Sequence, residues 1–98
     1  MFNCSLALQI LPMGIDQKKT IEVVDSVIEY VASKTDQYEV AAFETTIQGD
    51  YDDLMLILKE AIELASKSHH KIFANVKISY DAKESVLSIE EKTSKHIH

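Results

Sequence analysis

The sequence predicts a single α+β domain in which two helices cover one face of a four-stranded antiparallel sheet. Stretches of alternating apolar and polar residues are typical of strands, and two longer stretches with apolar residues every three or four positions are typical of helices. The chain has 98 residues, of which 46% are hydrophobic and 27% are charged, as in an ordinary globular protein. This length suits one hydrophobic core, so we expect one domain over residues 1–98.

The first strand and the first helix follow one another near the N-terminus. Leu6, Leu8 and Ile10 alternate with less apolar neighbours and predict a strand over residues 4–11, which Pro12 and Gly14 end. Asp16 is the predicted N-cap of a helix that runs to about residue 35. The predicted apolar stripe of this helix consists of Ile21, Val24, Ile28 and Val31.

The middle of the chain predicts a hairpin and a second helix. Residues 38–42 and 45–48 favour strands, which we expect to pair around Phe43 and Glu44. Asp50 can cap the following helix, which ends at residues 66–68 and whose apolar stripe consists of Leu54, Ile57, Leu58, Ala61, Leu64 and Ala65. Three further apolar residues, Met55, Leu56 and Ile62, predict either a partner for this helix or a deeply buried helix.

The last strand is predicted at residues 71–80, where apolar and polar residues alternate again. Ser88 and Glu91 have the spacing of a capping box, which predicts a short helix from Ile89 to about His96. The resulting order, βαββαβ plus a C-terminal helix, is that of the ferredoxin-like fold.

The predicted sheet has two chemically different faces. Leu6, Leu8, Ile10, Val76 and Ile78 would face the helices, whereas Ser5, Ala7, Gln9, Phe73, Asn75, Lys77 and Ser79 would face away. This mixed open face suits an oligomer interface that encloses a ligand, or alternatively a half-solvated sheet surface. We expect a homo-oligomer, because Ala7, Leu11 and Phe73 on this face, with Met55 and Ile62, are too apolar for a monomer.

Composition excludes several classes of function. The formal net charge is −6 and every basic residue except histidine is lysine, which argues against nucleic-acid binding and excludes sites built on arginine. The single cysteine, Cys4, excludes an internal disulfide and a cysteine-rich metal site. No stretch is apolar enough to span a membrane and the start lacks the features of a signal peptide, so we expect a cytoplasmic protein.

The residues that could carry chemistry do not form a recognisable catalytic pattern. Cys4, Ser5 and Thr45 are nucleophiles by type, but no base lies near them by sequence spacing, so we expect no enzymatic activity. The pairs His69-His70 and His96-x-His98 lie in a predicted loop and tail, and we expect neither a metal site nor a cofactor. We interpret the acidic residues Asp50, Asp52 and Asp53 as a helix N-terminus.

Several segments together resemble the thiamine-binding protein family. They are SLALQILP at residues 5–12, FETTIQGD at 43–50, YDDLM at 51–55, ANVKI at 74–78 and LSIEEK at 87–92. The resemblance covers nearly the whole chain in order. It implies a ferredoxin-like fold, dimers and tetramers assembled through the sheets, and binding of thiamine or its hydroxymethylpyrimidine moiety with no established catalytic activity.

The chain departs from this family at two places. Many members carry Gly-Thr where this chain has Glu44-Thr45, a change that alters the expected pocket. Many also carry Glu-Gly where this chain has Gln48-Gly49, which replaces a charge by its neutral isostere near the second helix.

The residue types suit an aminopyrimidine, a flat ring with an amino donor and ring-nitrogen acceptors. Phe43 could pack on the ring, Glu44 could accept from its amino group or balance a cation, and amide side chains could both donate and accept. The predicted ligand-binding residues are Ser5, Gln9, Phe43, Glu44, Thr45 and Asn75. The alternative interpretation makes Glu44 a solvated turn residue and Phe43 an apolar contact between subunits.

The leading hypothesis is therefore a non-enzymatic homo-oligomer that binds thiamine or hydroxymethylpyrimidine as a carrier, reservoir or sensor. A second hypothesis is an oligomeric regulatory module that senses another small metabolite, such as an amino acid. A third is an enzyme that acts on a pyrimidine.

Overall fold

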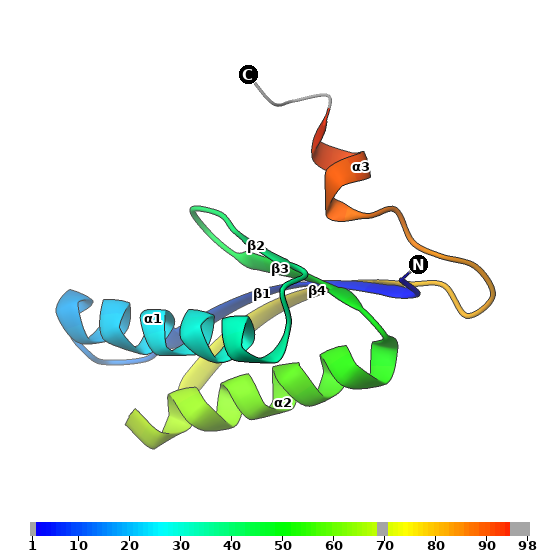
Figure 1. Ribbon diagram of the computed structural model, residues 1–98. Coiled ribbons are helices and arrows are strands. Elements are labelled where there is room, and N and C mark those ends of the chain that lie inside the picture. The colour runs from blue at the N-terminus through cyan, green and yellow to red at the C-terminus, as the bar shows by residue number, and fades with distance from the viewer. Residues whose placement is uncertain (1, 69–70, 95–98) are drawn as a thin grey trace.

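The computed structural model describes residues 2–68 and 71–94 and has the ferredoxin-like fold (Figure 1). Its four strands form one antiparallel sheet in the order β2-β3-β1-β4. Along the chain the elements are β1 (Cys4–Pro12), α1 (Gln17–Lys34), β2 (Tyr38–Val40), β3 (Thr45–Gly49), α2 (Tyr51–Ser68), β4 (Ile72–Tyr80) and α3 (Ile89–Thr93). The predicted fold class and element order are confirmed.

The ends of the helices follow the predicted capping residues. The Lys19 N–H donates to the Asp16 side chain over 2.8 Å at the start of α1, and the Asp52 N–H donates to the Asp50 side chain over 3.2 Å at α2. At α3 the Ser88 and Glu91 side chains each accept from the other residue's backbone N–H over 3.1 Å, which confirms the capping box. The predicted end of this helix at His96 lies outside the described residues.

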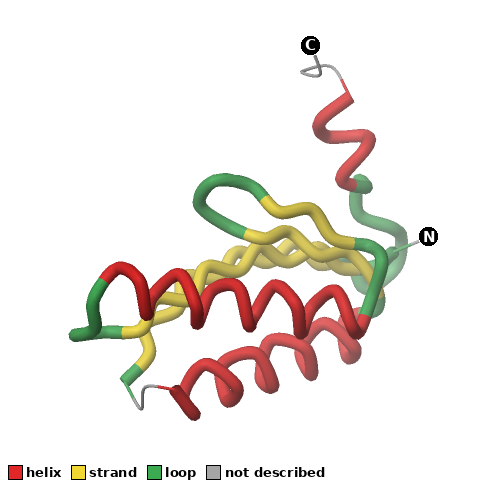
Figure 2. The backbone as a smooth tube through the Cα atoms, turned by 60° about the vertical axis from the view of Figure 1, so that its left-hand side comes forward, coloured by secondary structure: helices red, strands yellow, loops and turns green. Residues whose placement is uncertain are grey.

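Both long helices lie on the same face of the sheet, and α3 lies on the opposite side (Figures 1 and 2). The core forms between this helical layer and the sheet. Its buried apolar residues are Cys4, Leu6, Leu8, Ile10, Val23, Val27, Val31, Ile47, Leu54, Ile57, Ala61 and Ala65.

The predicted core stripe of α1 is wrong in part. Val23, Val27 and Val31 are buried, whereas Ile21 is exposed. Val24 and Ile28 are only half-buried at the edge of the contact. The register 23-27-31 and the pair 24-28 share the same four-residue spacing, so periodicity alone does not determine which of them faces the sheet.

Burial against the core explains part of the wide apolar surface of α2. Met55 and Ile62 are partly buried against the core, so they belong to the helix's packing with the rest of the domain. Leu56 is exposed on the other side of the helix.

β4 has the predicted orientation but less burial than expected. Val76 pairs with Leu8 and Ile78 pairs with Leu6, which places both on the helical side of the sheet. Ile78 is nevertheless 50% exposed, because β4 is an edge strand and has a neighbouring strand on one side only. At its end, the Tyr80 ring contacts the Tyr51 ring of α2 with centroids 4.5 Å apart.

Gln48 connects α3 to the sheet. This side chain is only 2% exposed, although it lies on the face opposite α1 and α2. Its Oε1 accepts from the Ile89 N–H over 2.7 Å, and its Nε2 donates to Gln37 over 2.9 Å. The buried amide therefore satisfies the first turn of α3 and holds that helix above one end of the open face.

Among the described residues, no helix combines the length and hydropathy of a membrane span.

Candidate functional site

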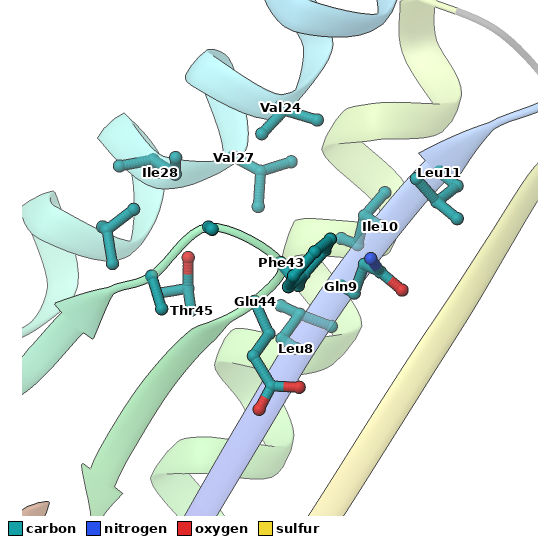
Figure 3. Close-up of a pocket in the computed structure, with 13 residues that line it drawn as sticks. Leu8, Gln9, Ile10, Leu11, Val24, Val27, Ile28, Phe43, Glu44 and Thr45 are labelled. Atoms are coloured by element: carbon teal, nitrogen blue, oxygen red, sulfur yellow. The ribbon is translucent and has the colours of Figure 1, made fainter. Parts of the chain in front are cut away.

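An apolar groove lies between α1 and the β2–β3 hairpin, and we call it the hairpin groove. It encloses about 160 Å³. Figure 3 shows its labelled residues, with Val24, Val27 and Ile28 of α1 on the side opposite the hairpin loop. The lining consists of Leu8, Gln9, Ile10, Leu11, Val24, Val27, Ile28 and residues 40–45.

The hairpin loop positions the aromatic side chain of this groove. Val40 pairs with Thr45 at the end of the two strands, and the Ala41 N–H donates to the Glu44 carbonyl over 2.9 Å. This closure ends β2 at Val40, two residues earlier than predicted, and leaves Phe43 at the loop tip. The Phe43 ring is 80% exposed, so one of its faces is free for a ligand or for another subunit.

Glu44 lies where the hairpin groove adjoins the open face of the sheet. It lines the hairpin groove, yet Figure 3 shows its carboxylate pointing away from α1. There its Oε1 accepts from the Lys77 Nζ of β4 over 3.1 Å. The Lys77 side chain is 77% exposed and the Glu44 side chain is 30% exposed. Ion pairs at the protein surface contribute at most about 1 kcal/mol, so a ligand could displace Lys77 at low cost.

Two of the predicted polar residues, Gln9 and Asn75, are hydrogen-bonded to each other on the open face. Asn75 Nδ2 donates to Gln9 Oε1 over 2.9 Å, as expected from their direct pairing between β4 and β1. Gln9 lines the hairpin groove and Asn75 is outside it. Asn75 therefore lies beside the Gln9 amide, outside the lining of this groove.

Ser5 is at a different place, in a hollow on the open face. This open-face hollow has a volume of about 280 Å³ and extends over three strands toward α3. It is lined by Ser5, Ala7, Glu44, Thr46, Lys77, Ile78, Ser79 and Lys92. Glu44 is the residue that the hollow and the hairpin groove share.

The six predicted site residues thus do not form one pocket. Gln9, Phe43, Glu44 and Thr45 line the hairpin groove, with Thr45 buried on the helical side. The prediction missed the aliphatic wall of α1, because Val24 and Ile28 were assigned to the core. It also missed Lys77 as the partner of Glu44, since the strand pairing that brings them together is not visible in the sequence.

The other candidates for chemistry are not at these sites. Cys4 is buried in the core, and this burial, with the Asp50 charge as a smaller cause, raises the pKa of its thiol. Both histidine pairs lie outside the described residues. Within residues 2–68 and 71–94, no cluster of three His, Cys, Asp or Glu side chains could hold a metal ion.

A further cavity of about 370 Å³ lies between the end of α1 and the start of α2. It is lined by Tyr30, Lys34 and Glu60, among others, and contains none of the six predicted residues. Burial, and after it the Glu60 carboxylate, raises the pKa of Tyr30.

Fold and groove together define a small ferredoxin-like domain with a ring-sized apolar site beside its hairpin. The family model for the thiamine-binding protein matches residues 6–97, and the chain belongs to this family.

Individual relatives agree with this assignment. A UPF0045 protein of Clostridium perfringens is 37% identical over 97 residues, which cover 98% of this chain and 99% of the relative. The crystal structure of protein SP2199 from Streptococcus pneumoniae is 42% identical with a TM-score of 0.80, over 93% of this chain and 97% of that one. A Thermotoga maritima protein, provisionally named for thiamine biosynthesis or salvage, is 26% identical with a TM-score of 0.85, over 96% and 98% of the two chains.

Proposed function

We propose that this protein binds thiamine or its hydroxymethylpyrimidine moiety without chemical turnover, as a carrier, reservoir or sensor. The observation that carries the proposal is the hairpin groove, which is lined by an exposed aromatic ring and an aliphatic wall, with Glu44 at its edge. Membership of the thiamine-binding family and the name of the Thermotoga maritima relative support the same ligand class.

The size of the groove suits a single ring. A cavity of roughly 150 Å³ holds a benzene-sized molecule, and the hairpin groove encloses about 160 Å³. A pyrimidine ring would therefore fill it, packed between Phe43 and the valines of α1. The thiazolium ring of thiamine would extend out of the groove toward solvent or another subunit.

The polar groups at the groove suit the edge of an aminopyrimidine. The Gln9 amide can donate to a ring nitrogen, and the Glu44 carboxylate can accept from the exocyclic amino group once it leaves Lys77. A negative side chain also suits the positive charge of thiamine, as does the net charge of −6.

The proposed assembly is a homodimer or homotetramer. Phe43 and Phe73 are exposed. β4 is a nine-residue edge strand, and its apolar residues Val76, Ile78 and Tyr80 are exposed as well. Long apolar edges of this kind favour pairing with another chain. We expect sedimentation equilibrium at micromolar concentration to give a dimer or tetramer, with each interface burying at least roughly 1,000 Å². A monomer at all concentrations would contradict this part of the proposal.

A thermal-shift screen tests the ligand class. Thiamine or hydroxymethylpyrimidine at 100 times its dissociation constant should stabilise the fold by about 2.7 kcal/mol. Stabilisation by amino acids but not by pyrimidines would instead favour a regulatory module for amino acids. Mass spectrometry of the bound pyrimidine separates binding from catalysis, because the proposal expects the compound to be recovered unchanged.

A further inference from the structure

The ion pair between Glu44 and Lys77 spans the central strand of the sheet. Glu44 precedes β3, whereas Lys77 lies on β4, and β1 separates these two strands. Ala7 of β1 pairs with Thr46 on one side and with Lys77 on the other. Because the Ala7 side chain is a single methyl group, the Lys77 side chain can extend over it to the Glu44 carboxylate, 3.1 Å from Nζ. The contact therefore depends on strand register and on a small residue between its two partners.

Lys77 supplies a positive charge that the walls of the hairpin groove lack. Among the described residues that line the groove, Glu44 is the ionisable side chain. The chain segments that form the walls contain no lysine over residues 8–11, 20–33 and 38–45. Lys77 is not part of the lining. The carboxylate of the groove is thus neutralised from outside, by a side chain of another strand.

The same contact sets the direction of the Glu44 side chain. Its carboxylate points away from α1, and Lys77 meets it on the open face (Figure 3). Lys77 is the more exposed partner, so its ammonium group returns to water easily when the pair opens. The less exposed carboxylate then favours another positive charge, because a partly buried charge is costly without a partner. Thiamine carries such a charge, whereas hydroxymethylpyrimidine is neutral.

We propose that Lys77 is a positioning residue that competes with the ligand for Glu44, and that the positive charge of thiamine displaces it. This inference rests on the proposed function, since it concerns the same groove. In the unliganded protein Lys77 holds the carboxylate away from the groove. On binding, Glu44 turns to the ligand and the Lys77 ammonium group moves into water. The protein thereby exchanges one cation for another at a single carboxylate.

Titration calorimetry of Lys77→Gln with thiamine and hydroxymethylpyrimidine tests this competition. The variant leaves Glu44 without its partner, so we expect thiamine to bind roughly two- to fivefold more tightly than to wild type, the factor that corresponds to a surface ion pair. Hydroxymethylpyrimidine should gain less, because the displaced ammonium group of wild type repels only a cationic ligand. A substitution that merely disturbs the structure would lower both affinities.

Two variants and one spectroscopic signal serve as controls. Lys59→Gln removes the lysine of another exposed ion pair, with Glu63 on α2 at 2.7 Å, and should leave both affinities unchanged. Lys77→Arg keeps the charge and should keep the wild-type affinities. Side-chain NMR should show that thiamine shifts the Nζ resonance of Lys77, although this residue does not line the groove.

The outcomes separate this inference from the proposed function. If thiamine binds to wild type but no more tightly to Lys77→Gln, the competition is overturned and the proposed function stands. An equal gain of affinity in Lys59→Gln also overturns it, because the effect would then come from net charge alone. If wild type binds neither compound, the proposed function and this inference both fail.

Discussion

The two faces of the central strand β1 differ in what they contribute, since one builds the core and the other lies at the candidate site. On the helical side Leu6, Leu8 and Ile10 are almost completely buried in the core. On the open side Gln9 is hydrogen-bonded to Asn75, and Ser5 and Ala7 line the open-face hollow. Because strand residues alternate, substitutions one position apart should affect either folding or binding, and seldom both.

A second comparison, between the centre and the edge of the sheet, shows the limit of alternation. Leu6 and Ile78 are paired neighbours on the same face, but Leu6 is 0% exposed and Ile78 is 50% exposed. Alternation determines the side on which a residue lies, whereas the position of the strand in the sheet determines how deeply it is buried.

The largest expected effect comes from the central residue of this pair. Leu6→Ala should lower the free energy of unfolding by about 2.7–5 kcal/mol, because it leaves a cavity in the closed core. Ile78→Ala at the edge should cost clearly less, since half of that side chain already contacts solvent. Urea unfolding of both variants makes the comparison, and equal losses would show that the edge is covered in solution, as a subunit interface would cover it.

Gln48→Leu should have the next largest effect, although the residue lies on the open face. It removes the acceptor of the Ile89 N–H and the donor to Gln37, and a buried group left unpaired costs about 1–3 kcal/mol. Gln17→Leu, an exposed control at the start of α1, should change stability by less than about 0.5 kcal/mol. If both substitutions are neutral by urea unfolding, the attachment of α3 through Gln48 is wrong.

Ser88→Ala should have a smaller and more local effect. Loss of this N-cap costs roughly 0.5–2 kcal/mol and should be confined to α3, because the capping box involves only Ser88 and Glu91. Hydrogen exchange at the Glu91 amide should accelerate while that of core strands is unchanged. Ser85→Ala, an exposed substitution in the preceding loop, is the matched control. A loss of ligand affinity without any change in exchange would assign Ser88 to a binding role instead.

Most of the fold could be predicted from the sequence because its signals are local. Each of these signals depends on residues that are neighbours in the sequence. They are the alternation of β1, the helix caps Asp16 and Ser88, and the hairpin around Phe43 and Glu44. The predicted stripe of α1 is wrong in part because two apolar registers with equal spacing, 23-27-31 and 24-28, could each face the sheet.

The candidate site was predicted less completely because its contacts join distant segments. Phe43 and Glu44 are predicted from their residue types and from the family resemblance of the segment that contains them. Their surroundings depend on α1 and on the pairing of β1 with β4, which brings Lys77 to Glu44 across 33 positions. Burial of Gln48 against α3 was likewise not predictable, since a polar residue in an alternating strand normally indicates solvent.

Glu44 lines both the hairpin groove and the open-face hollow, and its substitution tests the central claim most directly. Glu44→Gln keeps the shape of the side chain and removes its charge. A charge-assisted hydrogen bond contributes roughly 1.5–3 kcal/mol, so affinity for thiamine and hydroxymethylpyrimidine should fall about ten- to a hundredfold with little change in stability. Glu29→Gln removes the same charge from the exposed face of α1 and should have no effect.

Titration calorimetry of wild type, Glu44→Gln and Glu29→Gln with both compounds is the deciding measurement. We predict binding by wild type and Glu29→Gln and the stated loss in Glu44→Gln. Equal affinities in all three proteins would contradict the role of Glu44 and leave it a solvated turn residue. No binding of either compound by wild type would contradict the proposed function itself.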